Sequence, residues 1–509
     1  MKRKTNWLLI IMMILTVFLF SSPNLDEFIG YWEGINISKN TGQKSDAFIF
    51  INIQNNQANS YYSGGIFNLP MNVHLEDNAM LLTAQMNGYT FNATYTTQMD
   101  ILKGDLLMTD PNGTSDLLKG TFNRLYSNQR KFAFDIDYFK QVLPKKHLNL
   151  FFKTTQKDFN HACDELIKKA NRMTPAEIFL ELKSILARVD DPHTDIYGFN
   201  NYRNEYYPFF FKKIGNDYYL FETVNNYRHL LGSKLISIGG NNKEQLLKKL
   251  ESIIPAQNET GISVNAVEYL NSPLALAFCH VIDIGNETFL MEKDGKRFDI
   301  TPERLSAYEY RQNVIQLQWK PSLAEKRTNE NFFYEFFEED AILYFQFNRC
   351  VDNTDSTKPK FSQISEEILQ LLRTSNIKKF IVDMRYNTGG DSSYGTELAK
   401  RIQALNVDTK VYVIIGNSTF SSAILNTMDF KHYCNAITVG EPSQSSPWHY
   451  GETRYFILPN LGIKVFFSTK WFQYGSEESD QLEPDIEVYR TYNDFVSGID
   501  TVFEAIKLF

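Results

Sequence analysis

The chain has 509 residues, of which 43% are hydrophobic and 14% are aromatic, and its formal net charge is -8. This length exceeds one ordinary hydrophobic core and therefore predicts several domains. The acidic balance argues against nucleic acid as the main partner, because phosphate binding requires a basic surface. The four cysteines lie far apart without CxxC or metal-ligand spacing, so we expect free thiols and no metal site.

The first residues have the pattern of a targeting segment. Lys2, Arg3 and Lys4 precede an apolar run of 14 residues from 7 to 20. This is the length of a signal-peptide core and is short for a membrane span, and an uncleaved anchor remains an alternative. We expect residues 1–23 to be a signal peptide or N-terminal anchor. The protein would then be secreted or held at the cell envelope, with no other membrane contact.

Residues 27–125 contain short β-forming segments separated by Asn-Gly, Gly-Gly and Pro-Asn-Gly turns. This pattern predicts a small antiparallel barrel or sandwich. Gly30-Tyr31-Trp32 has the GxW form seen at the start of lipocalin-like barrels, but we favour the simpler reading of a buried tryptophan that anchors a barrel end. We expect a β-rich accessory domain, whose ligand the sequence does not identify.

A helical pattern covers the region 129–200. Thr174 and Glu177 flank Pro175 in the order of a capping box, which predicts a helix start. Pro192 disfavours helical geometry at the residue before it, so His193 would be presented from a loop.

Residues 204–310 combine β-forming segments with a helix predicted over 243–254. This pattern predicts a PDZ-like domain. A peptide groove that works by strand addition and a simple spacer are the two alternatives for its role.

The segment 332–509 is the clearest α/β unit of the chain. The predicted strands are 341–347, 380–384, 411–415 and 436–440, and the predicted helices are near 362–374, 392–405 and 421–433. Such alternation predicts a mainly parallel sheet covered by helices.

Two strand ends in this unit carry turns suited to chemistry. Gly389-Gly390 follows one strand and lets the backbone approach a ligand closely. Ser421 and Ser422 lie between the next strand and its helix, at the edge where open α/β sheets bind ligands. A serine there can be a nucleophile, with the following backbone N–H as an oxyanion donor. A helix N-cap explains the same serine without any chemistry.

Several sequence blocks, taken in order, resemble those of the S41 serine peptidases. This family includes the C-terminal processing proteases, the tricorn protease core and the repeats of interphotoreceptor retinoid-binding protein. The resemblance covers about residues 145–505. The blocks are DPHT at 191–194, GSKLISIGG at 232–240, FIVDMRYNTGG at 380–390, TFSSA at 419–423, VGEP at 439–442, YGE at 450–452, LPN at 458–460 and LEPD at 482–485.

The resemblance implies a multidomain α+β protein with a C-terminal catalytic α/β domain of the ClpP/crotonase-like kind. It implies that Ser421 is the nucleophile and His193 the general base. The oxyanion hole would come from the N–H of Ser422 together with that of Gly389 or Gly390.

The tricorn branch adds a glutamate that lies shortly before the Pro-Asp pair. Counting back in this chain gives Glu478, and Glu477 and Asp480 compete for the same role. The processing-protease branch instead uses a lysine base, but the stretch 440–450 contains no lysine, which disfavours that mechanism. His449 lies in this stretch, and we rank it as substrate-contacting or structural ahead of base.

The resemblance therefore implies a serine peptidase that cleaves polypeptide substrates through an acyl-enzyme and needs no metal or organic cofactor. Two departures from the family pattern, at 443–445 and at Ile424, keep an alternative open. That alternative is an inactive S41-like protein that binds peptides or small apolar ligands. The sequence leaves the oligomeric state open.

Overall fold

The computed structural model describes residues 28, 30–54, 57–60, 69–76, 79–86, 88–98, 101–124, 131–203, 205–283, 286–475 and 479–509. The expected signal peptide or anchor over 1–23 lies outside the described residues. The chain divides into two compact units. One contains Met1–Lys140, Cys163–Arg172 and Ile457–Lys464, and the other Gln141–Ala162, Met173–Phe456 and Val465–Phe509. None of the described helices combines the length and the apolar character needed to cross a membrane.

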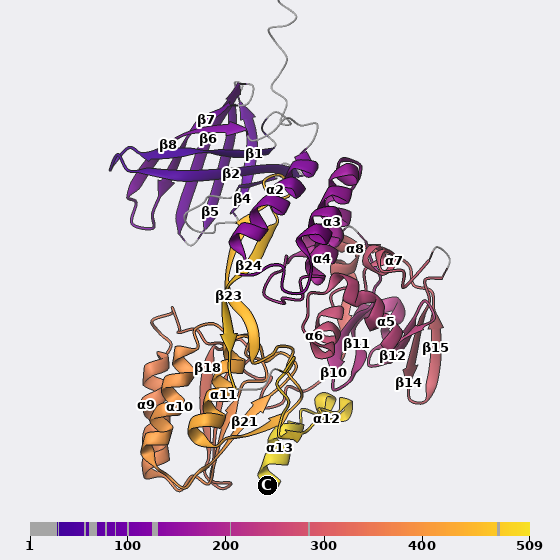
Figure 1. Ribbon diagram of the computed structural model, residues 1–509, viewed down its shortest axis with the longest axis vertical. Coiled ribbons are helices and arrows are strands. Elements are labelled where there is room, and N and C mark those ends of the chain that lie inside the picture. The colour runs from indigo at the N-terminus through magenta and orange to yellow at the C-terminus, as the bar shows by residue number, and fades with distance from the viewer. Residues whose placement is uncertain are drawn as a thin grey trace, which may run out of the picture. The chain divides into compact units, whose positions relative to one another are not determined.

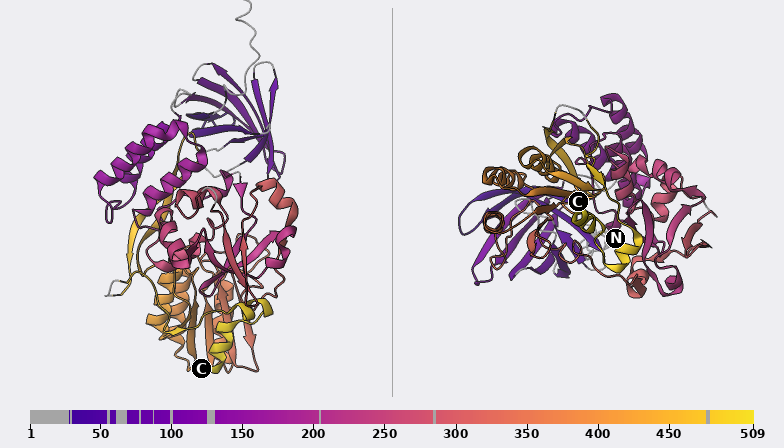
Figure 2. Two further views of the ribbon diagram at one scale, coloured as in Figure 1. Left: turned by 90° about the vertical axis from the view of Figure 1, so that its right-hand side faces the viewer. Right: turned by 90° about the horizontal axis from the view of Figure 1, so that it is seen from below.

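The first unit contains a closed antiparallel barrel of eight strands, shown in indigo and violet in Figures 1 and 2. Closure follows from the pairing of the first strand with both the second and the eighth. Trp32 is fully buried in the barrel, and its indole N–H donates to the carbonyl of Phe28 at 3.1 Å. The strands are β1 (Gly30–Ser38), β2 (Lys44–Gln54), β3 (Gln57–Ser60), β4 (Leu69–Glu76), β5 (Ala79–Met86), β6 (Tyr89–Gln98), β7 (Ile101–Thr109) and β8 (Ser115–Arg124).

Three helices follow the barrel along the chain: α2 (Lys131–Lys146), α3 (Gln156–Lys169) and α4 (Pro175–Ala187). The start of α4 is the one predicted. The hydroxyl of Thr174 accepts the backbone N–H of Glu177, and the carboxylate of Glu177 accepts the backbone N–H of Thr174. The capped, largely buried helix leads directly into the loop that carries His193.

The middle of the chain forms a separate mixed module around the sheet β10-β11-β12-β14-β15. The predicted helix at 243 is present but ends at Leu250, where a short 3-10 turn replaces its last residues. Binding of peptide by this module stays a prediction. Its sheet strands are β10 (Phe210–Ile214), β11 (Asp217–Val224), β12 (Lys234–Ile238), β13 (Asn241–Asn242), β14 (Phe289–Lys293), β15 (Lys296–Ile300) and β17 (Val314–Gln316). A small separate pair consists of β9 (Glu205–Tyr206) and β16 (Leu305–Ser306), and the helices are α5 (Lys243–Leu250), α6 (Glu259–Ala266), α7 (Pro273–Phe278) and α8 (Ala307–Asn313).

The C-terminal sheet has the order β18-β19-β20-β21-β22-β25 and is parallel except for its first pair. Its predicted strands and helices are present within one residue of their predicted ends. The strands are β18 (Phe332–Phe337), β19 (Ile342–Phe347), β20 (Lys379–Asp383), β21 (Lys410–Ile415), β22 (Ile437–Gly440) and β25 (Ile486–Glu487). The helices are α9 (Phe361–Thr374), α10 (Ser393–Leu405), α11 (Ser422–Cys434), α12 (Tyr492–Ser497) and α13 (Thr501–Leu508).

Alternate residues of each strand of this sheet face opposite sides of it. Leu343 and Phe345 of β19 pack with the apolar faces of α9, α10 and α11. Ile342 and Tyr344 pack with α13 on the other face. Helices thus cover both faces, as the mainly parallel sheet requires, and the carboxyl ends of β20 and β21 remain as a shared edge.

A two-stranded ribbon of β23 (Trp448–Ile457) and β24 (Lys464–Gln473) was not predicted from the sequence. Within the second unit it brings His449 and Phe472 to the edge of the sheet where β20 and β21 end.

Candidate active site

Ser421 lies in a strained turn between β21 and α11. Its backbone angles are φ 55° and ψ -126°, and a positive φ is uncommon for a residue with a side chain. Neighbouring hydrogen bonds hold the turn. The hydroxyl of Thr419 donates to the backbone carbonyl of Met384 at 2.9 Å. The N–H of Phe420 donates to the backbone carbonyl of Asn387 at 3.0 Å. Ser421 occupies the N-cap position, but its hydroxyl makes no capping hydrogen bond. Helix capping therefore does not account for this side chain.

The Gly389-Gly390 turn packs directly against Ser421 and Ser422. A Cβ atom on Gly389 would lie 2.8 Å from the Cβ of Ser421 and 3.0 Å from the backbone nitrogen of Ser422. Both glycines have positive φ, 102° and 132°, which side chains disfavour. Glycine at 389 therefore lets the ends of β20 and β21 approach closely, and glycine at 390 allows the close contact with the backbone of Cys350.

Backbone N–H groups at this contact differ in their availability. The N–H of Gly389 donates to the side-chain oxygen of Asn387 at 2.8 Å. The N–H groups of Gly390 and Ser422 make no hydrogen bond to any described residue. The hydroxyl of Ser422 donates to the carbonyl of Gly390 at 2.5 Å. Of the two glycines predicted as alternatives, Gly390 therefore keeps a free donor.

His193 lies in the same cavity as Ser421. The cavity measures about 530 Å³, and both Ser422 and Gly390 also line it. The imidazole is 6% exposed and stacks on Phe420, with 4.3 Å between ring centroids. Neither ring nitrogen has a hydrogen-bond partner among the described residues, so the hydroxyl of Ser421 is not bonded to it. The structure thus brings the predicted base and the predicted nucleophile into one cavity without a hydrogen bond between them.

Burial sets the protonation state of this imidazole. It lowers the pKa of His193 to about 3, an effect that Asp191 opposes and the neighbouring His449 increases. The ring is therefore neutral at ordinary pH, which is the state that a general base requires.

Asp191 is the buried carboxylate that holds the His193 loop. It is 1% exposed. It accepts the backbone N–H of His193 at 3.0 Å and the hydroxyls of Thr194 and Ser468 at 2.6 and 2.7 Å. Its Oδ1 lies 3.9 Å from Nδ1 of His193. Burial opposes ionisation, but hydrogen bonds from His147, Thr194 and Ser468 hold the pKa of Asp191 below its ordinary value.

His147 is the fourth donor to Asp191, with Nε2 at 3.0 Å from Oδ2. The backbone N–H of Asn149 donates to Nδ1 of His147 at 2.9 Å. Nδ1 is therefore an acceptor and, in the neutral ring, Nε2 carries the hydrogen. Sequence reasoning missed His147, because it belongs to no motif and its partner lies 44 positions along the chain.

A buried ion pair fixes the other side of the same loop. Lys183 of α4 lies 2.8 Å from both carboxylate oxygens of Asp195, and both side chains are more than nine-tenths buried. Removing either partner would leave a buried charge without compensation. The stretch from Asp191 to Asp195 is thus anchored at both ends.

The sequence predicts Glu478, with Glu477 and Asp480 as alternatives, as the acidic partner of His193. Glu478 and its competitor Glu477 lie outside the described residues. Asp480 is described, and its backbone carbonyl accepts the side-chain amide of Asn258 at 2.8 Å. Among the described residues, Asp191 is the carboxylate within 4 Å of the His193 ring.

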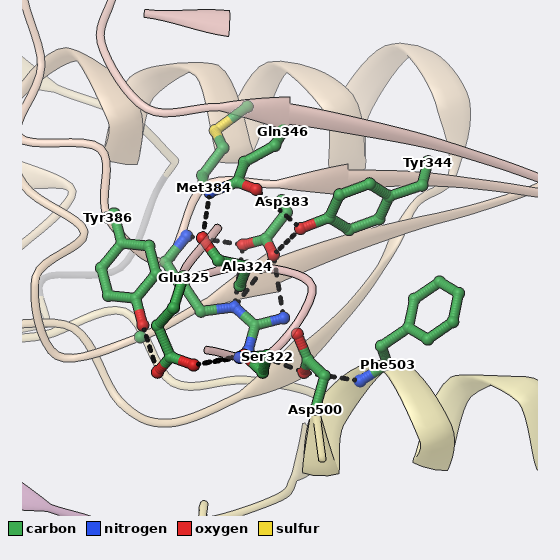
Figure 3. A network of polar contacts seen from close by, with 12 residues as sticks. Ser322, Ala324, Glu325, Tyr344, Gln346, Asp383, Met384, Tyr386, Asp500 and Phe503 are labelled. Atoms are coloured by element: carbon green, nitrogen blue, oxygen red, sulfur yellow. Dashed lines mark hydrogen bonds and ion pairs between the residues drawn. The ribbon is translucent and has the colours of Figure 1, made fainter. Parts of the chain in front are cut away.

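A polar network around Asp383 holds the end of β20 (Figure 3). The phenol of Tyr344 donates to Asp383 at 2.6 Å. Arg385 contacts the same carboxylate through Nε at 2.9 and 3.0 Å, and Asp500 through Nη1 at 2.8 Å. Asp500 in turn caps α13 by accepting the N–H of Phe503. The aspartate and arginine of the FIVDMRYNTGG block, Asp383 and Arg385, thus connect the sheet edge to the last helix.

The unpredicted ribbon supplies both apolar and polar residues to the cavity wall. Tyr197, Leu425, Phe466 and Phe472 contribute to it. Glu452 and Lys470 also line it and lie 3.8 Å apart, both more than half exposed. Among the described residues, no cluster of three His, Cys, Asp or Glu side chains could hold a metal ion.

No protein-family model and no curated protein sequence matches the chain. Solved structures with similarity include mature CPAF complexed with lactacystin, at 13% identity, with 72% of this chain and 95% of that chain covered and a TM-score of 0.48. The photosystem II D1 C-terminal processing protease is 10% identical, with coverages of 72% and 94% and a TM-score of 0.33. The tricorn protease is 11% identical, with coverages of 96% and 49% and a TM-score of 0.35. Because every one of these TM-scores is below 0.5, the assignment of a reaction rests on the residues of the site.

Proposed function

We propose that this protein is a serine peptidase of the S41 type that hydrolyses peptide bonds in polypeptides. One observation carries the proposal. Ser421 lies on a strained turn, and its hydroxyl makes no hydrogen bond that caps α11. It shares a cavity with the buried, neutral imidazole of His193. Residues held in strained backbone conformations cluster at functional sites.

In the proposed reaction, Ser421 Oγ attacks the carbonyl carbon of the peptide bond while His193 takes the hydroxyl proton. The backbone N–H groups of Ser422 and Gly390, which have no other described partner, stabilise the oxyanion. One such donor is typically worth about 10²–10³ in kcat. The carbon–nitrogen bond then breaks, and His193 returns the proton to the amine. Water then attacks the acyl-enzyme while His193 takes its proton. The bond to Ser421 Oγ breaks, and His193 returns the proton to Ser421.

The hydrogen bond between Ser421 and His193 forms, in this proposal, when substrate occupies the cavity. Catalytic hydrogen bonds are often absent from free enzymes and form in the complex. Asp191 supplies the negative charge that favours the imidazolium, from 3.9 Å. Glu478, implied by the family resemblance, is the alternative source of that charge.

We also propose that the protein acts outside the cytoplasm, as a secreted or envelope-anchored enzyme. The support is the basic start and the apolar run of residues 7–20. Amino-terminal sequencing of the mature protein tests this, since cleavage near residue 23 or retention of the whole segment distinguishes a signal peptide from an anchor.

Digestion of a decapeptide library tests the peptidase proposal. Mass spectrometry should detect cleavage products with the wild type and none with Ser421→Ala, with both proteins equally folded by circular dichroism. Equal products from both proteins would refute the role of Ser421.

A second candidate is an inactive S41-like protein that binds peptides or small apolar ligands. The missing bond between Ser421 and His193 favours it. Retention of peptides by a folded wild type that cleaves none would support this candidate.

A further inference from the structure

His449 is a second imidazole in the proposed catalytic cavity. It lies on β23 and is fully buried. Its ring is nearly parallel to that of His193, with 5.2 Å between centroids and 9° between planes, and Phe472 stacks on it at 5.4 Å and 26°. Because His193 also stacks on Phe420, four rings follow one another in the order Phe420, His193, His449 and Phe472.

The tautomer of His449 is fixed by its surroundings. Its Nδ1 lies 2.7 Å from the backbone carbonyl oxygen of Ser446. A carbonyl oxygen only accepts, so Nδ1 carries the hydrogen and the neutral ring presents an unprotonated Nε2. Ser446 is itself held, since its hydroxyl accepts the N–H of Trp448 at 2.8 Å and donates to the carbonyl of Ser479.

This Nε2 atom has no hydrogen-bond partner among the described residues. A buried acceptor without a donor is unfavourable in a folded protein, and each such group calls for an explanation. Burial also lowers the pKa of His449, although the hydrogen bond to Ser446 opposes this. The ring therefore remains an acceptor rather than becoming a cation.

The order of the four rings separates the roles of the two histidines. His193 is the ring next to Phe420, the residue that precedes Ser421, whereas His449 lies one ring further away. His193 is thus placed to serve the nucleophile. His449 belongs to the ribbon, which also contributes Phe466, Lys470 and Phe472 to the cavity.

We propose that His449 contacts the substrate and that its Nε2 accepts a hydrogen bond from a backbone N–H of the bound polypeptide. This inference rests on the proposed peptidase function and adds a substrate-binding residue to it. The donor is a peptide N–H because every polypeptide supplies one next to each cleaved bond, whatever its side chains.

Two substitutions separate the acceptor from the ring. His449→Phe keeps an aromatic ring in the stack and removes the acceptor, whereas His449→Gln places an amide oxygen where Nε2 lies and retains it. We expect His449→Phe to raise KM for library peptides by about tenfold or more, because a buried N–H of the substrate loses its partner. His449→Gln should stay within about threefold of the wild type.

A fluorophosphonate probe, which offers no peptide N–H, provides the second readout. Its reaction with Ser421 should fall by a smaller factor than the peptide KM rises in His449→Phe, since the probe does not use this acceptor. Unchanged peptide KM in His449→Phe, or an equal loss of probe reaction and peptide cleavage in that variant, would overturn the inference. Absence of both reactions in the wild type would instead overturn the proposed peptidase function.

Discussion

Asp191 accepts the backbone N–H of His193 at 3.0 Å and leaves both nitrogens of the imidazole unpaired. The carboxylate thus positions the backbone of the loop, while the ring stays available to a substrate complex. Hydroxyls of Thr194 and Ser468 and the imidazole of His147 complete its hydrogen bonds.

Asp191→Asn should both destabilise the protein and slow the reaction of Ser421. The amide would turn an N–H₂ group toward at least one donor, and a broken buried polar network costs about 3 kcal/mol or more. Urea unfolding and the rate of fluorophosphonate labelling measure the two effects. Wild-type values for both would show that this carboxylate does not hold the His193 loop.

Gly389→Ala should abolish labelling of Ser421, because its Cβ would lie 2.8 Å from the Cβ of Ser421. Gly295→Ala is the matched control. Gly295 also has positive φ, 72°, but a Cβ there meets nothing within 4 Å. We expect the rate of Ser421 labelling to fall by about 100-fold or more in Gly389→Ala, because an oxyanion donor is displaced. The rate should fall by less than about threefold in Gly295→Ala. Similar labelling of both variants would contradict the proposed contact between the two turns.

Acid should destabilise the protein through His193. Burial lowers its pKa to about 3 in the folded chain, from 6.5. The unfolded chain therefore binds a proton that the folded chain does not, so stability is complete above pH 6.5 and decreases as pH falls toward 3. Between pH 8 and pH 5 this group should cost about 2 kcal/mol of unfolding free energy.

Denaturant titrations at both pH values, on the wild type and on His193→Phe, measure this contribution. The phenyl ring keeps the stack on Phe420 and cannot titrate, so the variant should lose less stability on acidification. An equal loss in both proteins would assign the acid sensitivity to other groups.

Arg385→Met should destabilise the C-terminal sheet and the helices that pack on it. It leaves the buried carboxylates of Asp383 and Asp500 without their shared cation, which costs about 3–5 kcal/mol. Arg401→Met removes a surface partner of Glu366, 34% and 61% exposed, and should cost at most about 1 kcal/mol. Thermal unfolding followed by circular dichroism compares the two. A comparable fall in Tm would mean that the buried network adds nothing beyond a surface pair.

The C-terminal sheet was predictable because its signals are local. Strands β19 to β22 are continuous apolar runs, and the turns at Gly389 and Ser421 interrupt them where the sheet edge lies. The chemistry of the edge also follows from the chain, since parallel strands end together. The same reasoning located the capped start of α4.

The surroundings of His193 could not be predicted in the same way. His147 and Ser468 reach the site from segments that carry no motif, and the ribbon β23–β24 has polar and aromatic residues without clear alternation. The N–H of Gly389 is occupied because it donates to the side chain of Asn387. Whether that side chain reaches the N–H depends on the conformation of the folded turn. Such facts arise only when distant segments meet.

Identification of the residue that reacts with a fluorophosphonate probe tests the account most directly. Peptide mapping of the labelled wild type by mass spectrometry should find the adduct on Ser421. The adduct should be absent in Ser421→Ala and formed about 10²-fold or more slowly in His193→Ala, which lacks the base. A well-folded wild type that remains unlabelled at neutral pH, or an adduct on another serine, would contradict the proposal that Ser421 is a nucleophile served by His193.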